Sequence, residues 1–194
     1  MKDHEPLVSV IVVTYNSSLY VTQTLESAFN QSYKNLELIV TDDCSGDNTI
    51  RIAEDWISKF KTRFARVEIL TAAQNRGIPS NINKGVKAAR GEWIKVIAGD
   101  DILLENCISD NLAFVTRQNC TFVYSDLIWF LNDGTEIEHD RSEDRFRSAF
   151  NKLDSEGQLK YYCRYPVFLN SATWFYSKSI LNGFYDEYFK LLED

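Results

Sequence analysis

The strongest constraint on the fold is a regular alternation of strand-like and helix-like segments along the first 126 residues. The segment LVSVIVV at 7–13 is a continuous, mostly β-branched run, which is typical of a strand buried on both faces. Similar short apolar runs follow at 36–41, 66–70, 92–97 and 121–126, and amphipathic segments separate them. Strands that alternate with helices predict a parallel sheet with helices on both faces.

The segments between the strands carry apolar residues at helical spacing, which predicts helices at about 18–31, 48–60, 82–89 and 104–115. Asp47 or Asn48 is placed to cap the second of these helices, and Gly91 is placed to end the third helix as a C-cap glycine.

Beyond residue 126 the alternation fails. There the NDG at 132–134, between LIWFL and TEIEHD, predicts a β-hairpin.

Charge and cysteine content exclude several classes of protein. The net charge is −7, and no basic face is visible, which argues against a nucleic-acid partner. The small basic cluster of Lys59, Lys61, Arg63 and Arg66 is interpreted as the solvated face of a helix and its exit loop. Four cysteines without CxxC spacing and only two histidines, one of them His139 in a charged loop, argue against a zinc site.

The sequence also bears on location. No secretion signal is visible at the N-terminus, so we expect reduced thiols and a cytoplasmic protein, with the inner face of the membrane as an alternative position. The apolar run at 7–13 is too short to span a bilayer. Peripheral membrane association stays open, and so does the oligomeric state. The chain ends on acids within an apolar-periodic segment, which is typical of a truncated chain.

Polar clusters follow each of the first four predicted strands. In open α/β sheets, ligands collect at the carboxyl ends of the strands, so we expect these clusters to form one site. They are Thr14-Tyr15-Asn16, Asp42-Asp43, Asn75-Arg76-Gly77 and Asp100-Asp101.

The two acid pairs favour a divalent cation. No glycine-rich phosphate loop follows the first strand, so backbone amides of such a loop cannot hold a nucleotide's phosphates here. Mg²⁺ and Mn²⁺ usually bind through one or two carboxylates together with substrate phosphates, and Asp101 fits that need. Two simpler interpretations stay open: Asp100 and Asp101 could cap the next helix, and Asp42-Asp43 could form an Asx-rich turn.

Three stretches resemble a known family, the family 2 glycosyltransferases: PLVSVIVVTYNSSLYVTQTLESAFNQSYKNLELIVTDDCSGDNT, NRGIPSNINKGVKAARGEWIKVIAGDD and GFYDEYFKLLED. The resemblance covers most of 6–126, fades across 132–165 and returns near the C-terminus. It implies an α/β protein of the GT-A fold, with a Rossmann-like, mostly parallel sheet flanked by helices and an irregular C-terminal region. It further implies one domain over 1–194, with a nucleotide-sugar-binding half at 1–126 and an acceptor-side half at 127–194.

The resemblance assigns a role to each matching position. Asp43 would hydrogen-bond the base, commonly uracil, and Asp100 would face the ribose or the sugar. Asp101 would be the metal ligand, for Mn²⁺ or Mg²⁺, and Asp194 the catalytic base. The remaining nucleotide-sugar contacts would come from the segment that lines the base and from a loop over the nucleotide, namely Val13, Thr14, Tyr15, Asn16, Asn75 and Gly77.

The implied activity is metal-dependent, inverting transfer of a sugar from a nucleotide-sugar donor, commonly a UDP-sugar, to a hydroxyl of a glycan or lipid-linked acceptor in polysaccharide synthesis. One alternative is a non-catalytic relative that only binds a nucleotide or glycan, because Ala98 stands where many members carry an acid and the chain ends at Asp194. A further departure from the family is Ile82, which stands where members often carry an arginine. Another is a magnesium-binding phosphoryl-transfer domain of the receiver type. The fifth predicted strand lacks the lysine that a receiver needs, and the chain is too long for one.

Overall fold

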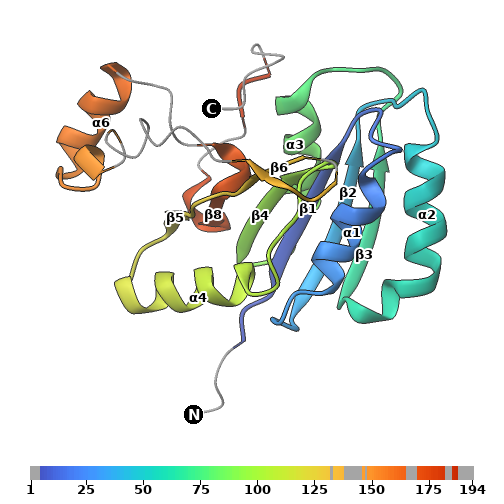
Figure 1. Ribbon diagram of the computed structural model, residues 1–194, viewed down its shortest axis with the longest axis horizontal. Coiled ribbons are helices and arrows are strands. Elements are labelled where there is room, and N and C mark those ends of the chain that lie inside the picture. The colour runs from blue at the N-terminus through green and yellow to red at the C-terminus, as the bar shows by residue number, and fades with distance from the viewer. Residues whose placement is uncertain are drawn as a thin grey trace. The chain divides into compact units, whose positions relative to one another are not determined.

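The computed structural model describes residues 5–131, 133–137, 146, 148–164, 170–181 and 185–187. The chain divides into two compact units, one of 1–123 with 174–194 and one of 124–173. The predicted site clusters all belong to the first unit, in which most of the strands also lie (Figure 1).

The main sheet is six-stranded, in the order β3-β2-β1-β4-β8-β5. Its four long strands run parallel, as predicted: β1 (Val8–Thr14), β2 (Leu36–Asp42), β3 (Arg66–Thr71) and β4 (Trp93–Ala98). The sequence did not predict β8 (Trp174–Ser177), which pairs antiparallel with β4 and separates it from β5 (Phe122–Tyr124). The fold is therefore α/β with a mixed, mostly parallel sheet.

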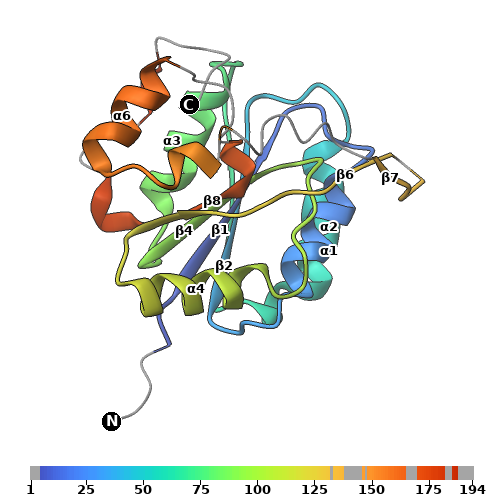
Figure 2. The same ribbon diagram turned by 60° about the vertical axis from the view of Figure 1, so that its left-hand side comes forward.

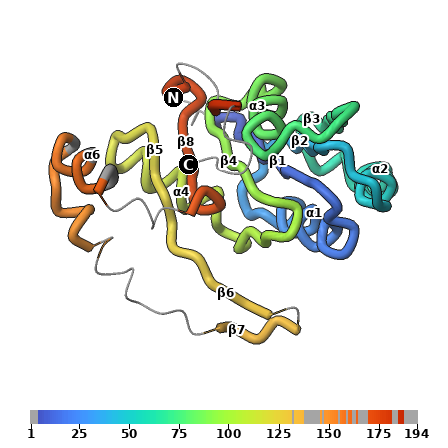
Figure 3. Tube along the Cα trace, turned by 90° about the horizontal axis from the view of Figure 1, so that it is seen from above, coloured from blue at the N-terminus to red at the C-terminus, as the bar shows by residue number. Residues whose placement is uncertain are grey.

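Helices cover both faces of this sheet. One face carries α1 (Val21–Phe29), α2 (Thr49–Phe60) and α4 (Cys107–Gln118), and the other carries α3 (Ile78–Ala88). Figure 3 shows α3 on the opposite side of β1 and β4 from α1 and α4.

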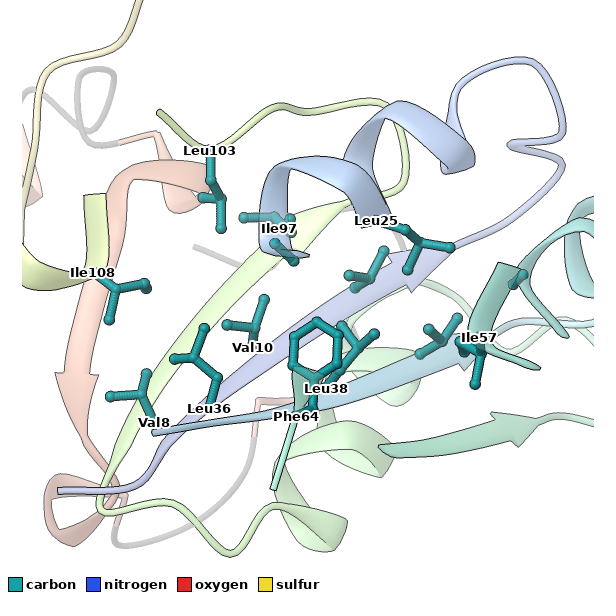
Figure 4. Close-up of a cluster of buried hydrophobic side chains, with 14 of the residues drawn as sticks. Val8, Val10, Leu25, Leu36, Leu38, Ile57, Phe64, Ile97, Leu103 and Ile108 are labelled. Atoms are coloured by element: carbon teal, nitrogen blue, oxygen red, sulfur yellow. The ribbon is translucent and has the colours of Figure 1, made fainter. Parts of the chain in front are cut away.

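Successive residues of a strand point to opposite faces, and this alternation builds both halves of the core. Val8 and Val10 of β1 lie in the cluster that includes Leu25 of α1 and Ile108 of α4 (Figure 4). Ile11, the residue that follows Val10 in β1, instead packs in the cluster on the α3 side. The continuous apolar run of β1 is thus explained by burial on both faces.

Asn48 is the N-cap residue of α2 but makes no side-chain capping bond, and Asp47 before it supplies the side-chain hydrogen bonds at the helix start. Oδ1 of Asp47 accepts hydrogen bonds from the backbone N–H of Thr49 at 2.9 Å and from the Thr49 hydroxyl at 2.5 Å. Its Oδ2 accepts from the N–H of Ser18 at 3.1 Å, which ties the start of α2 to the loop before α1. Desolvation raises the pKa of Asp47, but the hydrogen bonds from Thr49 and Ser18 outweigh it and lower the pKa to about 2.

Gly91 does not cap α3, contrary to prediction. The helix ends at Ala88, and Ala89 follows with an extended backbone. A Cβ at Gly91 would lie 2.6 Å from the backbone nitrogen of Ser9 and 2.8 Å from the carbonyl oxygen of Leu7. Glycine is needed at this position because the backbone of Gly91 lies very close to that of Leu7 and Ser9. It is not needed as a residue of left-handed conformation at the end of a helix.

Two of the four basic residues interpreted as solvated are in fact structural. Arg63 donates hydrogen bonds at 2.7–3.1 Å to four backbone carbonyls, and Arg66 donates at 2.9 Å to the fully buried carboxylate of Glu37. Lys59 and Lys61 are exposed, as expected. The four carbonyls bound by Arg63 belong to Phe29, Gln31, Tyr33 and Lys34.

The second unit contains the predicted hairpin. Its strands β6 (Trp129–Phe130) and β7 (Glu136–Ile137) pair antiparallel, and Gly134 of the turn has a φ of +83°. This unit also contains α6 (Ser155–Arg164), which the sequence did not predict (Figure 2). His139 lies outside the described residues. Across the described ranges, no helix is both long and apolar enough to cross a membrane.

Candidate functional site

The end of β1 lies between the ends of β2 and β4, so three of the predicted polar clusters share one edge of the sheet. Thr14 pairs in register with Asp42 on one side, and Val13 pairs with Ala98 on the other. Beyond the strands, the N–H of Asp43 donates to the carbonyl of Thr14 at 3.1 Å, and the N–H of Gly99 donates to that of Val13 at 2.8 Å. Parallel pairing thus brings the clusters together as expected.

Asp42, the first acid of its pair, is a turn residue. One oxygen accepts from the Ser45 N–H at 2.8 Å, and the other accepts from the Ser45 hydroxyl at 2.5 Å and the Thr14 hydroxyl at 2.9 Å. The Asx-turn interpretation is therefore right for Asp42.

Asp43 points to the α3 side and holds the loop before that helix. Its carboxylate is 4% exposed and accepts from the backbone N–H of Arg76 at 3.0 Å and from that of Gly77 at 2.7 Å. Gly77 is the N-cap of α3 with a φ of 93°, and the side-chain oxygen of Asn75 also accepts from its N–H at 3.1 Å. Asp43, Asn75 and Gly77 are thus brought together, with Arg76 between them.

The loop after β1 is fixed at Asn16 and leaves Tyr15 exposed. The N–H of Asn16 donates to the Ser45 hydroxyl at 2.8 Å, and its side-chain oxygen accepts from the N–H of Gly46 at 2.9 Å. Asn16 has a φ of 52°, a left-handed conformation that asparagine tolerates. The Tyr15 side chain is 51% exposed at this edge, and Val13 is half-buried.

A cleft of about 550 Å³ opens between the loop after β3 and α3. Asp43 contributes to its wall, together with the cationic side chains of Arg76, Lys84 and Lys87. The Lys84 ammonium donates to the carbonyl of Asp42 at 2.8 Å, and burial lowers its pKa although Asp43 and Asp42 oppose that shift. The other lining residues are Ala72, Ala73, Gln74, Ser80, Asn81, Asn83 and Glu187.

Asn81 is a buried residue of this cleft that the sequence analysis missed. Its amide nitrogen donates to the carbonyls of Thr14 and Thr41, each at 3.1 Å, and so links α3 to the ends of β1 and β2. Because both acceptors are carbonyls, exchanging the positions of the side-chain nitrogen and oxygen of Asn81 would lose both hydrogen bonds. No polar side chain in the described part of the chain donates to the Asn81 oxygen.

The second acid pair, Asp100-Asp101, does not cap a helix. The next helix, α4, begins at Cys107 with Asn106 as its N-cap, well after the acids. Asp100 is exposed and Asp101 is partly buried. Burial raises the pKa of Asp101, and the neighbouring Asp100 raises it further, while the Ala98 backbone and Lys95 oppose the shift. The helix-cap interpretation is therefore wrong for this pair.

Lys95 is a second residue that the sequence analysis missed. It lies within β4, is only 1% exposed, and interacts electrostatically with Asp101 and Cys107. Burial lowers the pKa of its ammonium group, and those two neighbours oppose the shift. The sequence did contain a sign of this role, namely a lysine within the apolar run WIKVIA. A lysine is rarely buried without a partner, so its place in a buried strand indicates an interaction with a neighbouring group.

The carboxylates of Asp100 and Asp101 are chemically suited to bind a divalent cation. No group of three or more histidine, cysteine or acidic side chains suited to a metal occurs in the ranges that the structure describes. A site completed by substrate phosphates needs only one or two carboxylates, and Asp100 and Asp101 meet that requirement. Their mutual repulsion and the burial of Asp101 make a bound cation favourable. Asp194, the predicted catalytic base, lies outside the described residues.

Comparison with solved structures supports the fold. The crystal structure of Staphylococcus aureus TarS matches with a TM-score of 0.70 and 24% identity over 96% of this chain and 32% of that one. A shorter form of TarS in complex with UDP-GlcNAc matches with a TM-score of 0.65 and 24% identity over 90% of this chain and 46% of that one. At these identities the likeness shows the fold alone, and it confirms the GT-A expectation.

Comparison with curated sequences gives relatives of greater length. The putative teichuronic acid biosynthesis glycosyltransferase TuaG of Bacillus subtilis (strain 168) is 28% identical over 160 residues, which are 82% of this chain and 60% of that protein. An uncharacterized glycosyltransferase of Haemophilus influenzae is 31% identical over 133 residues, 69% of this chain and 52% of that protein. The chain thus spans only about half to three fifths of these relatives. The family model described as glycosyl transferase family 2 matches residues 9–182, nearly the whole chain, and the chain therefore belongs to that family.

Proposed function

We propose that this chain forms the donor-binding and catalytic part of a metal-dependent, inverting glycosyltransferase that uses a UDP-sugar. One observation carries the proposal: Asp100 and Asp101 follow β4 without capping α4, and they lie at the same edge of the sheet as Asp43. Support for the donor comes from TarS, named as a poly(ribitol-phosphate) β-N-acetylglucosaminyltransferase and solved in complex with UDP-GlcNAc.

The donor nucleotide would bind across the ends of β1 and β2. The exposed ring of Tyr15 offers a surface on which a uracil base can stack, and such contacts are worth about 1–3 kcal/mol. Asp43 would accept the hydrogen bond of the base N–H, because a carboxylate that already accepts from Arg76 and Gly77 still has acceptor capacity. Val13, Thr14 and Asn16 would complete this side, and Asn75 and Gly77 would belong to the loop over the nucleotide.

The diphosphate would lie toward the second acid pair. Asp101 would hold a divalent cation, Mn²⁺ or Mg²⁺, and Asp100 would face the ribose or the sugar. The bound cation would supply Lewis-acid stabilisation of the charge that develops on the departing diphosphate. Lys95, a buried lysine that interacts electrostatically with Asp101, would oppose the rise in the pKa of that carboxyl that its burial causes.

The transfer step would be a single displacement. The acceptor hydroxyl oxygen forms a bond to the anomeric carbon while the bond from that carbon to the diphosphate oxygen breaks, so the configuration inverts. Asp194 would take the hydroxyl proton as general base, which typically contributes about 10²–10⁴-fold to the rate. The acceptor would be a glycan or lipid-linked saccharide bound by the 127–194 half; among the relatives, TuaG is named for teichuronic acid biosynthesis.

A binding screen followed by product analysis tests the proposal. We expect UDP-sugars in the presence of Mn²⁺ to raise the melting temperature more than GDP-, CDP- or ADP-sugars do. With the full-length protein and an acceptor, ¹H NMR should show a product of inverted anomeric configuration. Binding without transfer in the full-length protein would instead indicate a non-catalytic binding module, and a product of retained configuration would contradict the displacement step.

A further inference from the structure

A residue distant in sequence, Glu187, contributes to the wall of the cleft beside Asp43. One oxygen of its carboxylate accepts from the side-chain nitrogen of Asn83 at 3.2 Å. The other accepts from the guanidinium of Arg76 at 3.1 Å, and both of these partners line the same cleft. The Glu187 carboxylate is therefore fixed on two sides, although its side chain is 42% exposed.

Asn83 anchors the segment that carries Glu187. The Asn83 oxygen accepts from the backbone N–H of Tyr185 at 2.7 Å, and the Asn83 nitrogen donates to the carbonyl of Tyr185 at 2.8 Å. A single buried amide thus pairs both backbone groups of Tyr185. The Tyr185 side chain also packs against the buried cluster on the α3 side of the sheet. Glu187 is therefore held by a buried residue of α3 and not by surface charge alone.

Arg76 joins Glu187 to the carboxylate that is expected to bind the base. The Arg76 backbone N–H donates to both oxygens of Asp43, each at 3.0 Å, and the N–H of Gly77 donates at 2.7 Å. An exposed ion pair contributes little stability by itself. The pair between Arg76 and Glu187, however, ties the loop that binds Asp43 to an anchored segment. Glu187 thus restrains the loop whose N–H groups orient Asp43.

We propose that Glu187 is a positioning residue for the donor nucleotide: it fixes the Arg76 loop and so sets the orientation of the Asp43 carboxylate. The inference rests on the proposed function, in which Asp43 accepts from the N–H of the base. Uracil has a ring N–H that can donate to this carboxylate, whereas the corresponding nitrogen of cytosine is an acceptor, which a carboxylate repels. A fixed Asp43 therefore favours UDP over CDP. A loose loop must be ordered when UDP binds, and its carboxylate can turn away from cytosine, so the preference falls.

Two substitutions of Glu187 in the full-length protein test this role by titration calorimetry of UDP and CDP. Glu187→Ala removes both contacts, and Glu187→Gln keeps the shape, but its single amide oxygen cannot accept from both partners. We expect UDP to bind about 3- to 10-fold more weakly in Glu187→Ala. The ratio of UDP to CDP affinity should fall at least about 3-fold in both variants. The gain in UDP affinity from Mn²⁺ should change less than about 2-fold, because the cation binds the diphosphate and not the base.

Asp186→Ala is the matched control. Asp186 is the neighbouring exposed acid, and it is not among the described residues that line the cleft. The substitution removes the same charge and should leave the ratio of UDP to CDP affinity within about 2-fold of its value in the unmodified protein. An equal fall in the control and in the Glu187 variants would overturn the inference.

Arg76→Met tests the route by which Glu187 acts. This substitution removes the guanidinium and keeps the backbone N–H that donates to Asp43. If Glu187 acts through the guanidinium, adding Glu187→Ala to Arg76→Met should change the ratio of UDP to CDP affinity by less than about 1.5-fold. Fully additive effects of the two substitutions would contradict that route.

Hydrogen exchange at the Arg76 and Gly77 amides gives a readout that does not depend on nucleotide. We expect exchange at these amides to be at least about 5-fold faster in Glu187→Ala than in the unmodified protein or in Asp186→Ala. Unchanged exchange, or an unchanged ratio of UDP to CDP affinity in both Glu187 variants, would overturn the inference. If the unmodified protein did not bind UDP, the proposed function would fail, and the positioning role with it. A normal preference for UDP that survives both Glu187 substitutions would remove the positioning role alone.

Discussion

At the residue scale, the two acids at the end of β2 differ because neighbouring residues of a strand face opposite sides of the sheet. Asp42 turns toward the side of α1 and stabilises the turn at Ser45, whereas Asp43 turns toward α3 and holds the N–H groups of Arg76 and Gly77. The sequence shows only two adjacent acids. Their different partners follow from the alternation of the strand and from the loops on each side.

This difference predicts different effects of the same substitution. Asp43→Asn should weaken UDP binding by about 10-fold or more, because a charge-assisted hydrogen bond contributes about 1.5–3 kcal/mol. Asp42→Asn should mainly lower the melting temperature, since its carboxylate serves Ser45 and Thr14. Titration calorimetry of UDP and thermal unfolding of both variants check this. An equal loss of UDP affinity in the two variants would contradict the assignment of Asp43.

Gly91 allows a second prediction at this scale. Gly91→Ala would bring a Cβ within 2.6 Å of the Ser9 nitrogen and 2.8 Å of the Leu7 carbonyl oxygen, so the backbones must separate. We expect a loss of about 1–3 kcal/mol in the free energy of unfolding, measured in urea. Gly46→Ala is the control, because the nearest atom to its Cβ would be 4.0 Å away. A loss of equal size in the control would refute the close-approach explanation.

At the scale of elements, Arg63 lies in the 3₁₀ turn that follows α2 (Lys61–Arg63) and links this turn to the end of α1 and to the segment that joins α1 to β2. Its guanidinium bonds to four backbone carbonyls, and a lysine has no planar fork with which to do the same. Arg63→Lys should therefore lower the free energy of unfolding by about 1–3 kcal/mol. Lys61→Ala, an exposed neighbour, should change it by less than about 0.5 kcal/mol. Equal stability of Arg63→Lys and the unmodified protein would show that charge alone suffices.

Elements with a strong local pattern were predictable from the sequence. The first four strands were predicted to within a residue or two because each is a short, largely apolar run, which in β1 and β2 is buried along almost its whole length. β8 was missed because its four residues lie beyond the alternating region, and only pairing with β4 makes them a strand. The helix α4 was expected to begin at Leu104 but begins at Cys107, which leaves the acid pair outside it.

Candidate site residues could be recognised in the sequence only where their neighbours in sequence marked them. Asp43 and Asp101 stood out because each belongs to an acid pair after an apolar run. Asn83 gave no local signal, since its partner Tyr185 is 102 residues away. The same holds for Arg63, whose carbonyl partners lie about 30 residues earlier in the chain. Long-range contacts of this kind depend on the completed fold.

At the scale of the whole molecule, the proposed chemistry divides donor binding from proton removal. Donor binding belongs to the strand ends of the first unit, and proton removal to Asp194. In the full-length protein, Asp194→Asn should keep the affinity for UDP and lower the transfer rate by about 10²–10⁴-fold, because asparagine cannot accept the hydroxyl proton. UDP binding and product formation are measured on the same preparation. Unchanged turnover would remove Asp194 from the role of base.

The central claim is that Asp101 holds a cation which joins the protein to a diphosphate. Isothermal titration of UDP into the protein, with and without Mn²⁺, and into Asp101→Asn with Mn²⁺, tests this most directly. We expect UDP to bind at least about 10-fold more tightly with Mn²⁺, and the substitution to remove that gain, since charge-assisted contacts to a diphosphate contribute more than about 1.4 kcal/mol. Equal affinity with and without Mn²⁺, or full retention of the gain in Asp101→Asn, would contradict the account.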